Sequence, residues 1–335
     1  MSKLLTIFIP TYNRSGMLDI TLARLKNEVA SGGLDKHVDF LVGNNASEDA
    51  TLVVLKRHNI RTYSNEKNIG ITRNYLMGLS LVNSKYIWIF GDDDDVAPGL
   101  LKCIIQEIIC SDYDAIYLPA IPINREQYFD YMLLYKLDFY NTKTFCLKNN
   151  MHESLKIIDR DSGFIGSHIF KKSTLSQAVD KYTNDEKLLQ NVYYCRLLAY
   201  NVYFHGKSKM YLTPVIFKNI GQGSYFSNTI DNVIKTYIVD TYELYPYFKK
   251  INYTMYKGIR KLNSRRWGLC AIIKINKVKS ANHLLFKELL IHRDPWVVGF
   301  LLSPSLIIKS LYFYYKKMKG EKMPWPIQDK YTDKI

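Results

Sequence analysis

The sequence predicts an α/β protein in which a mostly parallel, doubly wound sheet with flanking helices is followed by a mainly helical, basic C-terminal region. Two observations predict the sheet. Short apolar runs alternate four times with segments of helical periodicity over residues 4–90, which is the pattern of repeated strand and helix units. The unusual polar residues follow these apolar runs, and parallel sheets bind ligands beyond the carboxyl ends of their strands.

The individual elements follow from the same periodicity. The first apolar run, LLTIFI at residues 4–9, stops at Pro10 and is typical of a buried parallel strand. We expect further strands at 38–42, 60–63 and 86–90, with helices at 17–29, 49–58 and 71–82. Later in the chain we expect a strand at 115–119, a helix at 187–200 and a strand over the apolar run 210–217.

The charge of the chain is unevenly distributed. The formal net charge is +15, yet the first 200 residues hold equal numbers of basic and acidic residues, so the excess lies in residues 201–335. We therefore divide the chain into a first domain, residues 1–225, and a basic, aromatic-rich helical region, residues 226–335. Such a basic region should attract an anionic surface, either phospholipid or nucleic acid.

Nucleic acid is the weaker of these two expectations. The sequence contains no RNP, KH or zinc-finger pattern, and its basic residues are interleaved with long apolar runs. The run WVVGFLLSPSLIIKSLYFYY at 296–315, interrupted by Pro304 and Lys309, is a poor spanning helix and a better interfacial segment on an anionic leaflet. A pair of C-terminal core helices is the alternative. The sequence does not indicate an oligomeric state.

The cysteines and the N-terminus predict a cytoplasmic location. The five cysteines include no CxxC pair, and the first residues, MSKLLTIFIPTYN, lack a signal-peptide pattern. Together with the basic region, this predicts a protein that lies peripherally on an anionic membrane surface.

Four consecutive carboxylates, Asp92 to Asp95, follow the apolar run at 86–90 and Gly91. Carboxylates this close raise one another's pKa, and a divalent cation is the natural compensation. Oxygen ligands at a strand end suit Mg²⁺ or Mn²⁺, whose remaining positions can be filled by substrate phosphate oxygens. The alternative is a solvated acidic turn. The preceding buried strand favours the cation site, because that edge of a parallel sheet is the expected binding edge.

Four motifs in order give the chain a resemblance to a known family. They are PTYNR at 10–14, GNNASED at 43–49, NIGITRN at 68–74 and the acidic run before Pro98. This arrangement resembles the family 2 glycosyltransferases. The resemblance implies the GT-A fold, a nucleotide-sugar donor and an acidic DXD-type motif that holds a divalent cation, Mn²⁺ or Mg²⁺, and the donor diphosphate.

The resemblance also implies roles for particular residues. The nucleotide-sugar would be bound by Pro10, Thr11, Tyr12, Arg14, Asn44, Asn68, Gly70, Arg73, Asp92 and Asp93. The metal would be held by Asp92, Asp93 and Asp94. Aligned on Pro98, Gly91 stands at the first acidic place of the motif, so Asp92 would replace the missing ligand. Asn44 stands where the family usually has Asp, which leaves the choice of nucleotide base open.

An inverting transferase needs a general base for the acceptor hydroxyl. The resemblance points to Asp185 and Glu186, which precede the helix expected at 187–200, with Asp161 as a second candidate. Acidic residues also favour helix N-termini as caps, so a purely structural role for this pair is the alternative. The GQGS sequence at 221–224 resembles a loop that closes over donor diphosphate, and a simple turn is equally consistent with it.

The acceptor is implied by a further resemblance of layout. The chain is similar to bacterial O-antigen sugar transferases of the abequosyltransferase type. This resemblance implies a polyprenyl-diphosphate-linked glycan acceptor in surface polysaccharide synthesis, and a peripheral location at the inner face of the bacterial cytoplasmic membrane. The nearest string to the QxxRW motif of processive enzymes is NSRRW at 263–267, without the glutamine, so transfer of a single sugar is expected. The alternatives are a sugar-phosphate nucleotidyltransferase, disfavoured because residues 10–14 are not a GxGxR loop, and a degenerate protein that only binds nucleotide-sugar.

Overall fold

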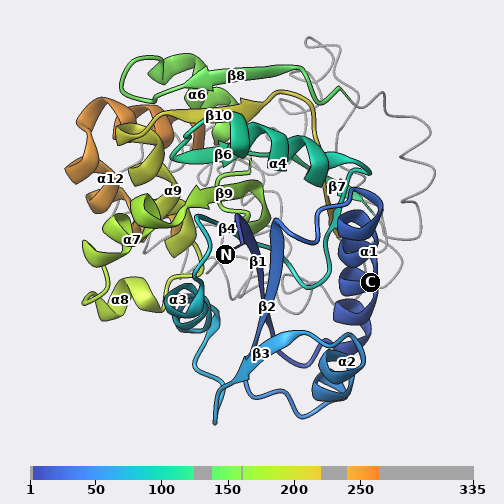
Figure 1. Ribbon diagram of the computed structural model, residues 1–335. Helices are drawn as coiled ribbons and strands as arrows, with labels where there is room; N and C mark the ends of the chain where they lie inside the picture. The colour runs from blue at the N-terminus through green and yellow to red at the C-terminus, as the bar shows by residue number, and fades with distance from the viewer. Residues whose placement is uncertain (1–2, 124–137, 160, 220–239, 264–335) are drawn as a thin grey trace, which may run out of the picture. The chain divides into compact units, whose positions relative to one another are not determined.

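The computed structural model describes residues 3–123, 138–159, 161–219 and 240–263 (Figure 1). The chain divides into two compact units, Met1–Leu262 and Asn263–Ile335. The predicted loop at 221–224, the apolar run at 296–315 and nearly all of the basic C-terminal region lie outside the described residues. The predictions for these segments, and for a boundary after residue 225, therefore stay predictions.

The expected strands and helices of the first part are present within about two residues of their predicted ends. The first four strands are β1 (Leu5–Thr11), β2 (Val38–Asn44), β3 (Arg61–Ser64) and β4 (Tyr86–Ile89). The helices between them are α1 (Ser15–Ser31), α2 (Thr51–Arg57) and α3 (Ile71–Leu81). The helix after the acidic run is α4 (Leu100–Cys110).

These four strands form the parallel half of an eight-stranded sheet with the order β3-β2-β1-β4-β9-β6-β10-β8. β1 pairs in parallel with both β2 and β4, and β2 pairs in parallel with β3. The doubly wound, mostly parallel arrangement is thus confirmed. Chain order reverses at β1, because β2 and β3 lie on one side and β4 on the other, and such a switch point is where ligands bind in open α/β sheets.

The second half of the sheet contains antiparallel strands that the sequence did not predict. β9 (His168–Lys171) lies between β4 and β6 (Ala115–Tyr117) and is antiparallel to both. β10 (Ser208–Tyr211) is parallel to β6, and β8 (Thr142–Phe145) closes the edge antiparallel to β10. A small second sheet has the order β5-β11-β7, formed by β5 (Asp95–Val96), β11 (Ile216–Asn219) and β7 (Ala120–Ile123).

The remaining described helices lie after residue 150. They are α6 (Met151–Ile158), α7 (Lys172–Asp180), α8 (Glu186–Leu189), α9 (Tyr194–His205), α11 (Asp240–Glu243) and α12 (Tyr245–Ile251), and residues 253–263 are also helical. α7 and α12 both pack against α9, which is buried along eleven of its residues. Within the described part of the chain, no helix has both the length and the apolar character needed to cross a membrane.

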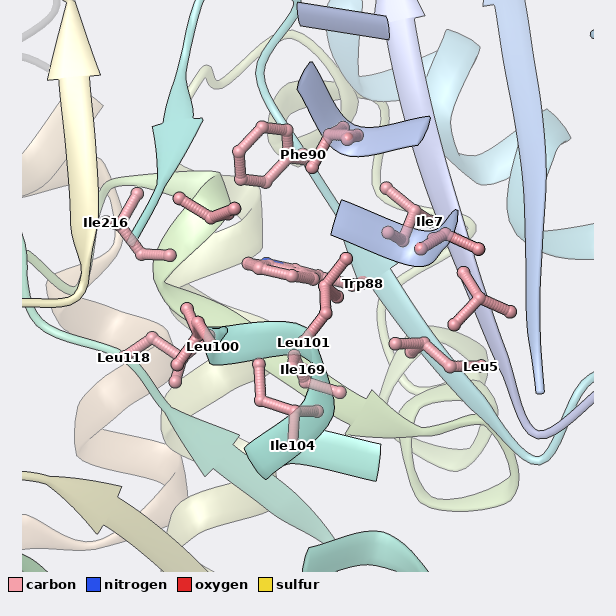
Figure 2. Close-up of a cluster of buried hydrophobic side chains, with 14 of the residues drawn as sticks. Leu5, Ile7, Trp88, Phe90, Leu100, Leu101, Ile104, Leu118, Ile169 and Ile216 are labelled. Atoms are coloured by element: carbon pink, nitrogen blue, oxygen red, sulfur yellow. The ribbon is translucent and has the colours of Figure 1, made fainter. Parts of the chain in front are cut away.

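The main core lies between one face of the sheet and helices α1 and α4. Figure 2 shows Trp88 and Phe90 of the β4 segment beside Leu100, Leu101 and Ile104 of α4. Alternate residues of β1, Leu5, Ile7 and Ile9, point to this same core, as expected for a strand whose successive side chains face opposite sides.

The opposite face of β1 packs against α3 at very close range. A Cβ atom on Gly78 of α3 would lie 2.2 Å from the ring of Phe8, a separation that no real contact tolerates. Glycine at this position therefore sets how near α3 can approach the sheet. α3 begins directly after the loop that follows β3. The packing of α3 on the sheet therefore also sets where the residues of the first turn of α3 lie.

Two predicted elements are wrong in extent, and each has a physical reason. The helix expected at 187–200 is interrupted after Leu189 and resumes at Tyr194. Asn191 causes the break, because its side chain accepts a hydrogen bond from the backbone of Tyr193 (2.9 Å) and donates one to the carbonyl of Asp240 (2.8 Å). Asparagine competes with helical hydrogen bonding in this way. The apolar run 210–217 is divided near Pro214 between β10 and β11, which belong to different sheets.

Candidate active site

The predicted binding loops meet at one edge of the sheet. β1, β2, β3 and β4 are parallel and end at Thr11, Asn44, Ser64 and Ile89. The polar loops that follow these strands therefore lie side by side, although up to about 80 residues separate them in sequence. The site consequently forms at the edge that the strand pattern predicts.

The four carboxylates of the acidic run are all buried, with exposed fractions of 5, 9, 2 and 3% for Asp92 to Asp95. A solvated acidic turn is therefore not what this run forms. Arg14, at the start of α1, bridges the first two carboxylates: its Nη1 lies 3.1 Å from Asp92 Oδ1, and its Nη2 donates to Asp93 Oδ2. Thr11 Oγ1 donates to Asp92 Oδ2 at 2.7 Å. Both oxygens of Asp92 thus have partners from the first loop.

Asp94 and Asp95 face other parts of the fold. Asp94 Oδ1 accepts a hydrogen bond from the backbone N–H of Asn219 at the end of β11 (3.2 Å), and Asp95 pairs with Arg24 of α1. The other Asp94 oxygen occupies the space that a side chain on Gly91 would fill, 2.0 Å from an ideal Cβ. Glycine is required at position 91 because the Asp94 carboxylate lies there.

The environment makes negative charge unfavourable in this cluster. Burial raises the pKa of Asp92 to about 6, even though Arg14 opposes the shift. Burial, and then repulsion from Asp93, raises the pKa of Asp94 well above its ordinary range. Burial by itself would lower the pKa of Arg14, but Asp92 and Asp93 hold it above the usual value. Strongly shifted carboxylates in a cluster at a ligand-binding edge are a mark of functional sites.

The oxygen atoms of Asp93 and Asp94 suit a divalent cation. Asp93 Oδ1 and Asp94 Oδ2 lie on the same side of Gly91, at 3.5 and 2.0 Å from its ideal Cβ. No three Asp, Glu, His or Cys side chains of the described residues surround one metal position. A cation held by the carboxylates of Asp93 and Asp94 would have the small protein contribution typical of Mg²⁺ sites completed by water and substrate phosphates. Asp92, which Arg14 and Thr11 hold, is the least available of the three predicted ligands.

The second loop is fixed by a network of asparagine side chains. Asn44 is 1% exposed; its amide donates to Ser64 Oγ (3.1 Å), and its carbonyl oxygen accepts from the backbone of Ser47 (3.0 Å). Asn45 donates to Asn68 Oδ1 at 2.8 Å, which joins the loop after β2 to the loop after β3. In this structure Asn44 shapes the loop that was expected to contact a nucleotide base.

Other predicted residues lie at the rim of the same edge. Tyr12 is 40% exposed, which leaves its ring available to a ligand. Asn68 Oδ1 also accepts from the backbone of Gly70 (2.9 Å), and Gly70 has φ of 84°, which favours glycine. Pro10 is the penultimate residue of β1. These residues border the edge of the sheet as the sequence predicts, and nothing in the structure tests what they bind.

The acidic pair Asp185 and Glu186 lies beside the first turn of α3. Arg73 of α3 pairs with Glu186, whose side chain is 73% exposed. Thr72 Oγ1 donates to the carbonyl of Asn191 at 3.2 Å, a second link between α3 and the segment that carries Glu186. Because α3 begins at the carboxyl edge of the sheet, these contacts bring Glu186 to the same edge as the binding loops.

Asp185 has a different environment from its neighbour. Its Oδ1 accepts from the backbone N–H groups of Lys187 (3.1 Å) and Leu188 (3.2 Å), so it caps α8, and its Oδ2 accepts from Tyr247 Oη (2.5 Å). The Tyr247 hydrogen bond, with the cap, lowers the pKa of Asp185. The helix-capping alternative is therefore correct for Asp185, whereas the side chain of Glu186 is largely exposed to solvent.

Asp161, the second candidate for a base, is engaged elsewhere. Its Oδ2 accepts from the backbone of Ala120 at 3.3 Å, at the start of β7. Sequence reasoning missed Lys218 of β11, whose positive charge acts on Asp94 and whose Nζ lies 5.1 Å from the centre of the Phe164 ring. Nothing in the spacing of Lys218 distinguishes it from other lysines, because β11 meets the acidic run only through the second sheet.

Comparison with known proteins agrees with this geometry. Residues 6–166 match the family described as Glycosyl transferase family 2. Over 121 residues the chain is 37% identical to abequosyltransferase RfbV of Salmonella typhimurium (strain LT2), an alignment that covers 34% of this chain and 35% of that protein. The chain thus matches about a third of the length of this relative.

Solved structures share the fold at low sequence identity. TarS 1-349 of S. aureus superposes with a TM-score of 0.53 at 12% identity, covering 95% of this chain and 92% of that one. A mannosyltransferase of Pyrobaculum calidifontis, PcManGT, solved in complex with GDP-Man and Mn²⁺, gives a TM-score of 0.50 at 13% identity, with 96% and 89% covered. These similarities concern the fold alone.

The fold, with its polar loops at the carboxyl edge of the sheet, is that of the GT-A class. Residues 6–166 match family 2 of the glycosyltransferases, and over 121 residues the chain resembles the abequosyltransferase type. The family and fold expected from the four motifs are confirmed.

Proposed function

We propose that this protein transfers a single sugar, with inversion, from a nucleotide-sugar donor to a glycan acceptor. The observation that carries the proposal is the buried run Asp92–Asp95 at the carboxyl edge of β4, with Arg14 bridging its first two carboxylates. The Mn²⁺ and GDP-Man of PcManGT, and the UDP bound to a TarS structure that superposes with a TM-score of 0.50, support donors of this chemical class.

In this proposal the donor lies across the ends of β1, β2 and β4. Tyr12 offers an exposed ring to the nucleoside, and Arg14 and Lys218 supply positive charge near the diphosphate. A divalent cation held by Asp93 and Asp94 would neutralise the negative charge that develops on the departing nucleoside diphosphate. Arg14 limits the repulsion between the carboxylates and that diphosphate, because it already neutralises part of the charge of Asp92 and Asp93.

Glu186 is the base of the proposed reaction. It accepts the proton of the acceptor hydroxyl as that oxygen forms a bond to the anomeric carbon, and the bond from this carbon to the diphosphate oxygen breaks. Its exposure and its position at the carboxyl edge support this assignment. Arg73 orients this carboxylate through their ion pair.

The acceptor in this proposal is a polyprenyl-diphosphate-linked glycan of a bacterial surface polysaccharide. The support is the 37% identity to an abequosyltransferase over 121 residues. A degenerate protein that binds nucleotide-sugar without transfer remains the contrasting outcome that the experiment below distinguishes.

A thermal-shift panel tests the proposal. The full chain is heated with UDP, CDP, GDP or dTDP, each with Mn²⁺ or with EDTA. A ligand at a hundred times its Kd should stabilise the folded state by about 2.7 kcal/mol. We expect one nucleotide to raise the melting temperature only with Mn²⁺. The absence of a shift with all four nucleotides would contradict the donor site.

Two variants separate binding from turnover. Asp94→Ala should remove the Mn²⁺-dependent shift and the slow hydrolysis of the matching nucleotide-sugar, while melting remains cooperative. Asp35→Ala, an exposed aspartate away from the edge, should change neither. If the wild-type protein binds nucleotide but transfers and hydrolyses no sugar, the chain is a binding protein and not a transferase.

A further inference from the structure

The last described helices carry a basic, aromatic face that the candidate active site does not use. It is formed by Lys249 and Lys250 of α12 and by Tyr253 and Lys257 of the helical segment 253–263, all of them exposed. We call these four residues the basic face. The segment 244–263 holds five basic residues and no Asp or Glu, so its own composition is strongly basic.

Three of these four residues form one cluster, although Asn252 interrupts the helix between its two parts. Lys249 Nζ lies 5.8 Å from the centre of the Tyr253 ring, and Lys257 Nζ lies 4.6 Å from the same centre. Two ammonium groups thus flank one aromatic ring that is 53% exposed. Lys250 Nζ lies 5.7 Å from the Tyr247 ring and extends the positive charge toward α8.

The inward side of these helices is apolar and firmly packed. Phe248, Met255 and Ile259 are fully buried, and α12 packs against α9. Tyr200 of α9 and Phe248 have ring centres 5.3 Å apart. The lysines therefore extend outward from a fixed support, so their positive charge is concentrated on one surface and faces outward.

We infer that the basic face docks the protein on an anionic phospholipid bilayer. Lysines near an anionic leaflet are attracted to it electrostatically, and an exposed tyrosine suits the boundary between headgroups and acyl chains. The later sequence favours lipid over nucleic acid, because it continues through residue 315 with basic residues between long apolar runs. Such a composition suits an interface and not a polar nucleic-acid groove.

The position of the basic face has a consequence for the proposed reaction. Tyr247, beside Lys250, donates its hydroxyl to Asp185, the residue before Glu186. A bilayer bound at the basic face would therefore lie close to the proposed base, on the side from which a lipid-linked acceptor arrives. This consequence rests on the proposed function, whereas docking itself does not.

Vesicle binding tests the inference directly. The full chain is sedimented with two kinds of vesicle, at low and at physiological salt. The neutral vesicles contain phosphatidylcholine alone, and the anionic vesicles, which are the probe, contain phosphatidylcholine with 30% phosphatidylglycerol. We expect binding to the anionic vesicles that weakens with salt, because exposed charges are screened. The face variant K249E/K250E/K257E should bind them at least tenfold more weakly.

A matched variant controls for net charge. K36E/K56E/K102E replaces three exposed lysines elsewhere on the molecule, so both triple variants have a formal net charge of +9 in place of +15. The control should bind within about twofold of wild type. Equal losses in both variants would show that total charge is responsible, and an unchanged face variant would show that other residues bind; either result overturns the inference.

Two further measurements complete the test. Tyr253→Ala should lower the part of the binding that persists at high salt, since its ring contributes apolar contact. The second measurement is binding to a single-stranded oligonucleotide. If the wild type binds it, and the face variant loses this binding but still binds vesicles, the basic face belongs to nucleic acid and the inference is overturned. Cooperative melting shows that each variant folds. Donor binding is measured by the nucleotide thermal shift and membrane docking by sedimentation, so either proposal can fail without the other.

Discussion

Arg14 Nη1 lies 3.1 Å from Asp92 Oδ1, so the loop after the first strand neutralises the acidic run that begins 78 residues later. The side chains are 21 and 7% exposed, which makes this contact much less screened than a surface ion pair. Thr11 holds the other oxygen of the same carboxylate. The first motif and the acidic run are thus linked by an ion pair and a hydrogen bond to the same carboxylate.

Removing Arg14 should destabilise the folded protein. Arg14→Ala leaves Asp92 and Asp93 buried without their shared cation, and we expect a loss of about 1–3 kcal/mol in the free energy of unfolding at pH 7.5. Urea denaturation followed by circular dichroism measures it. Arg57→Ala is the control, because Arg57 is 58% exposed in its pair with Asp19, and the expected loss is under about 1 kcal/mol. Equal losses in the two variants would show that the burial of the Arg14 contacts is unimportant.

The two carboxylates proposed for the base should respond differently to amide substitution. Glu186→Gln removes the proton acceptor, so kcat should fall by about 10²–10⁴-fold with little change in KM for the donor. Asp185→Asn keeps a good N-cap residue, so kcat should fall less than about tenfold. Initial rates with the donor identified by the thermal-shift panel measure both. The reverse order of effects would assign the base to Asp185.

Glycine substitutions in two helices should have opposite signs. Gly78→Ala places a methyl group 2.2 Å from the Phe8 ring, so the α3 contact must open, and we expect a net loss of about 1–3 kcal/mol despite the better helix propensity of alanine. Gly16→Ala in α1 meets no atom within 4 Å and should stabilise the protein by about 0.5–1 kcal/mol. Thermal or urea unfolding measures both. Stabilisation by Gly78→Ala would contradict the packing described for α3 and β1.

His168 should make stability depend on pH. Its ring is buried between Tyr203 Oη (2.7 Å) and the carbonyl of Ser162 (3.2 Å), and burial lowers its pKa to about 4. Below its ordinary pKa of about 6.5 the unfolded chain gains a proton that the folded chain does not, so stability is full above pH 6.5. It falls by up to about 3 kcal/mol as the pH drops toward 4.

A substitution isolates this contribution from the rest of the protein. The raised pKa of Asp92 acts in the opposite direction, because a carboxyl group protonated more readily in the folded state stabilises it as the pH falls. The stability of His168→Gln measured from pH 7.5 to 4 should therefore decline less than that of the wild type, by up to about 3 kcal/mol. Parallel curves for the two proteins would show that His168 is not held neutral by burial.

The first half of the fold could be predicted because its signals are local. The apolar runs of β1 and β4 are buried on both faces, so each is a nearly continuous apolar stretch in the sequence. Helices with clear periodicity follow β1, β2 and β3. The same pattern fixed the edge where the loops meet. Asp92 and Asp93 were candidates because they follow a buried strand at this edge, whereas Arg14 and Arg73 became candidates through the family that the four motifs resemble.

What the sequence alone could not determine depends on contacts between distant segments. The antiparallel β9 enters the centre of the sheet, Asn191 divides a helix by bonding to Asp240, and Asp94 reaches the backbone of Asn219. None of these has a periodic signature, because the partner lies 49 or more residues away. Composition and spacing thus determined the class of fold, the binding edge and the acidic site. Only tertiary structure decided which partners each carboxylate of the acidic run has, and which of Asp185 and Glu186 caps a helix. It also decided that Lys249 and Lys257 flank Tyr253. Burial and long-range contacts, which a local pattern does not encode, set each of these.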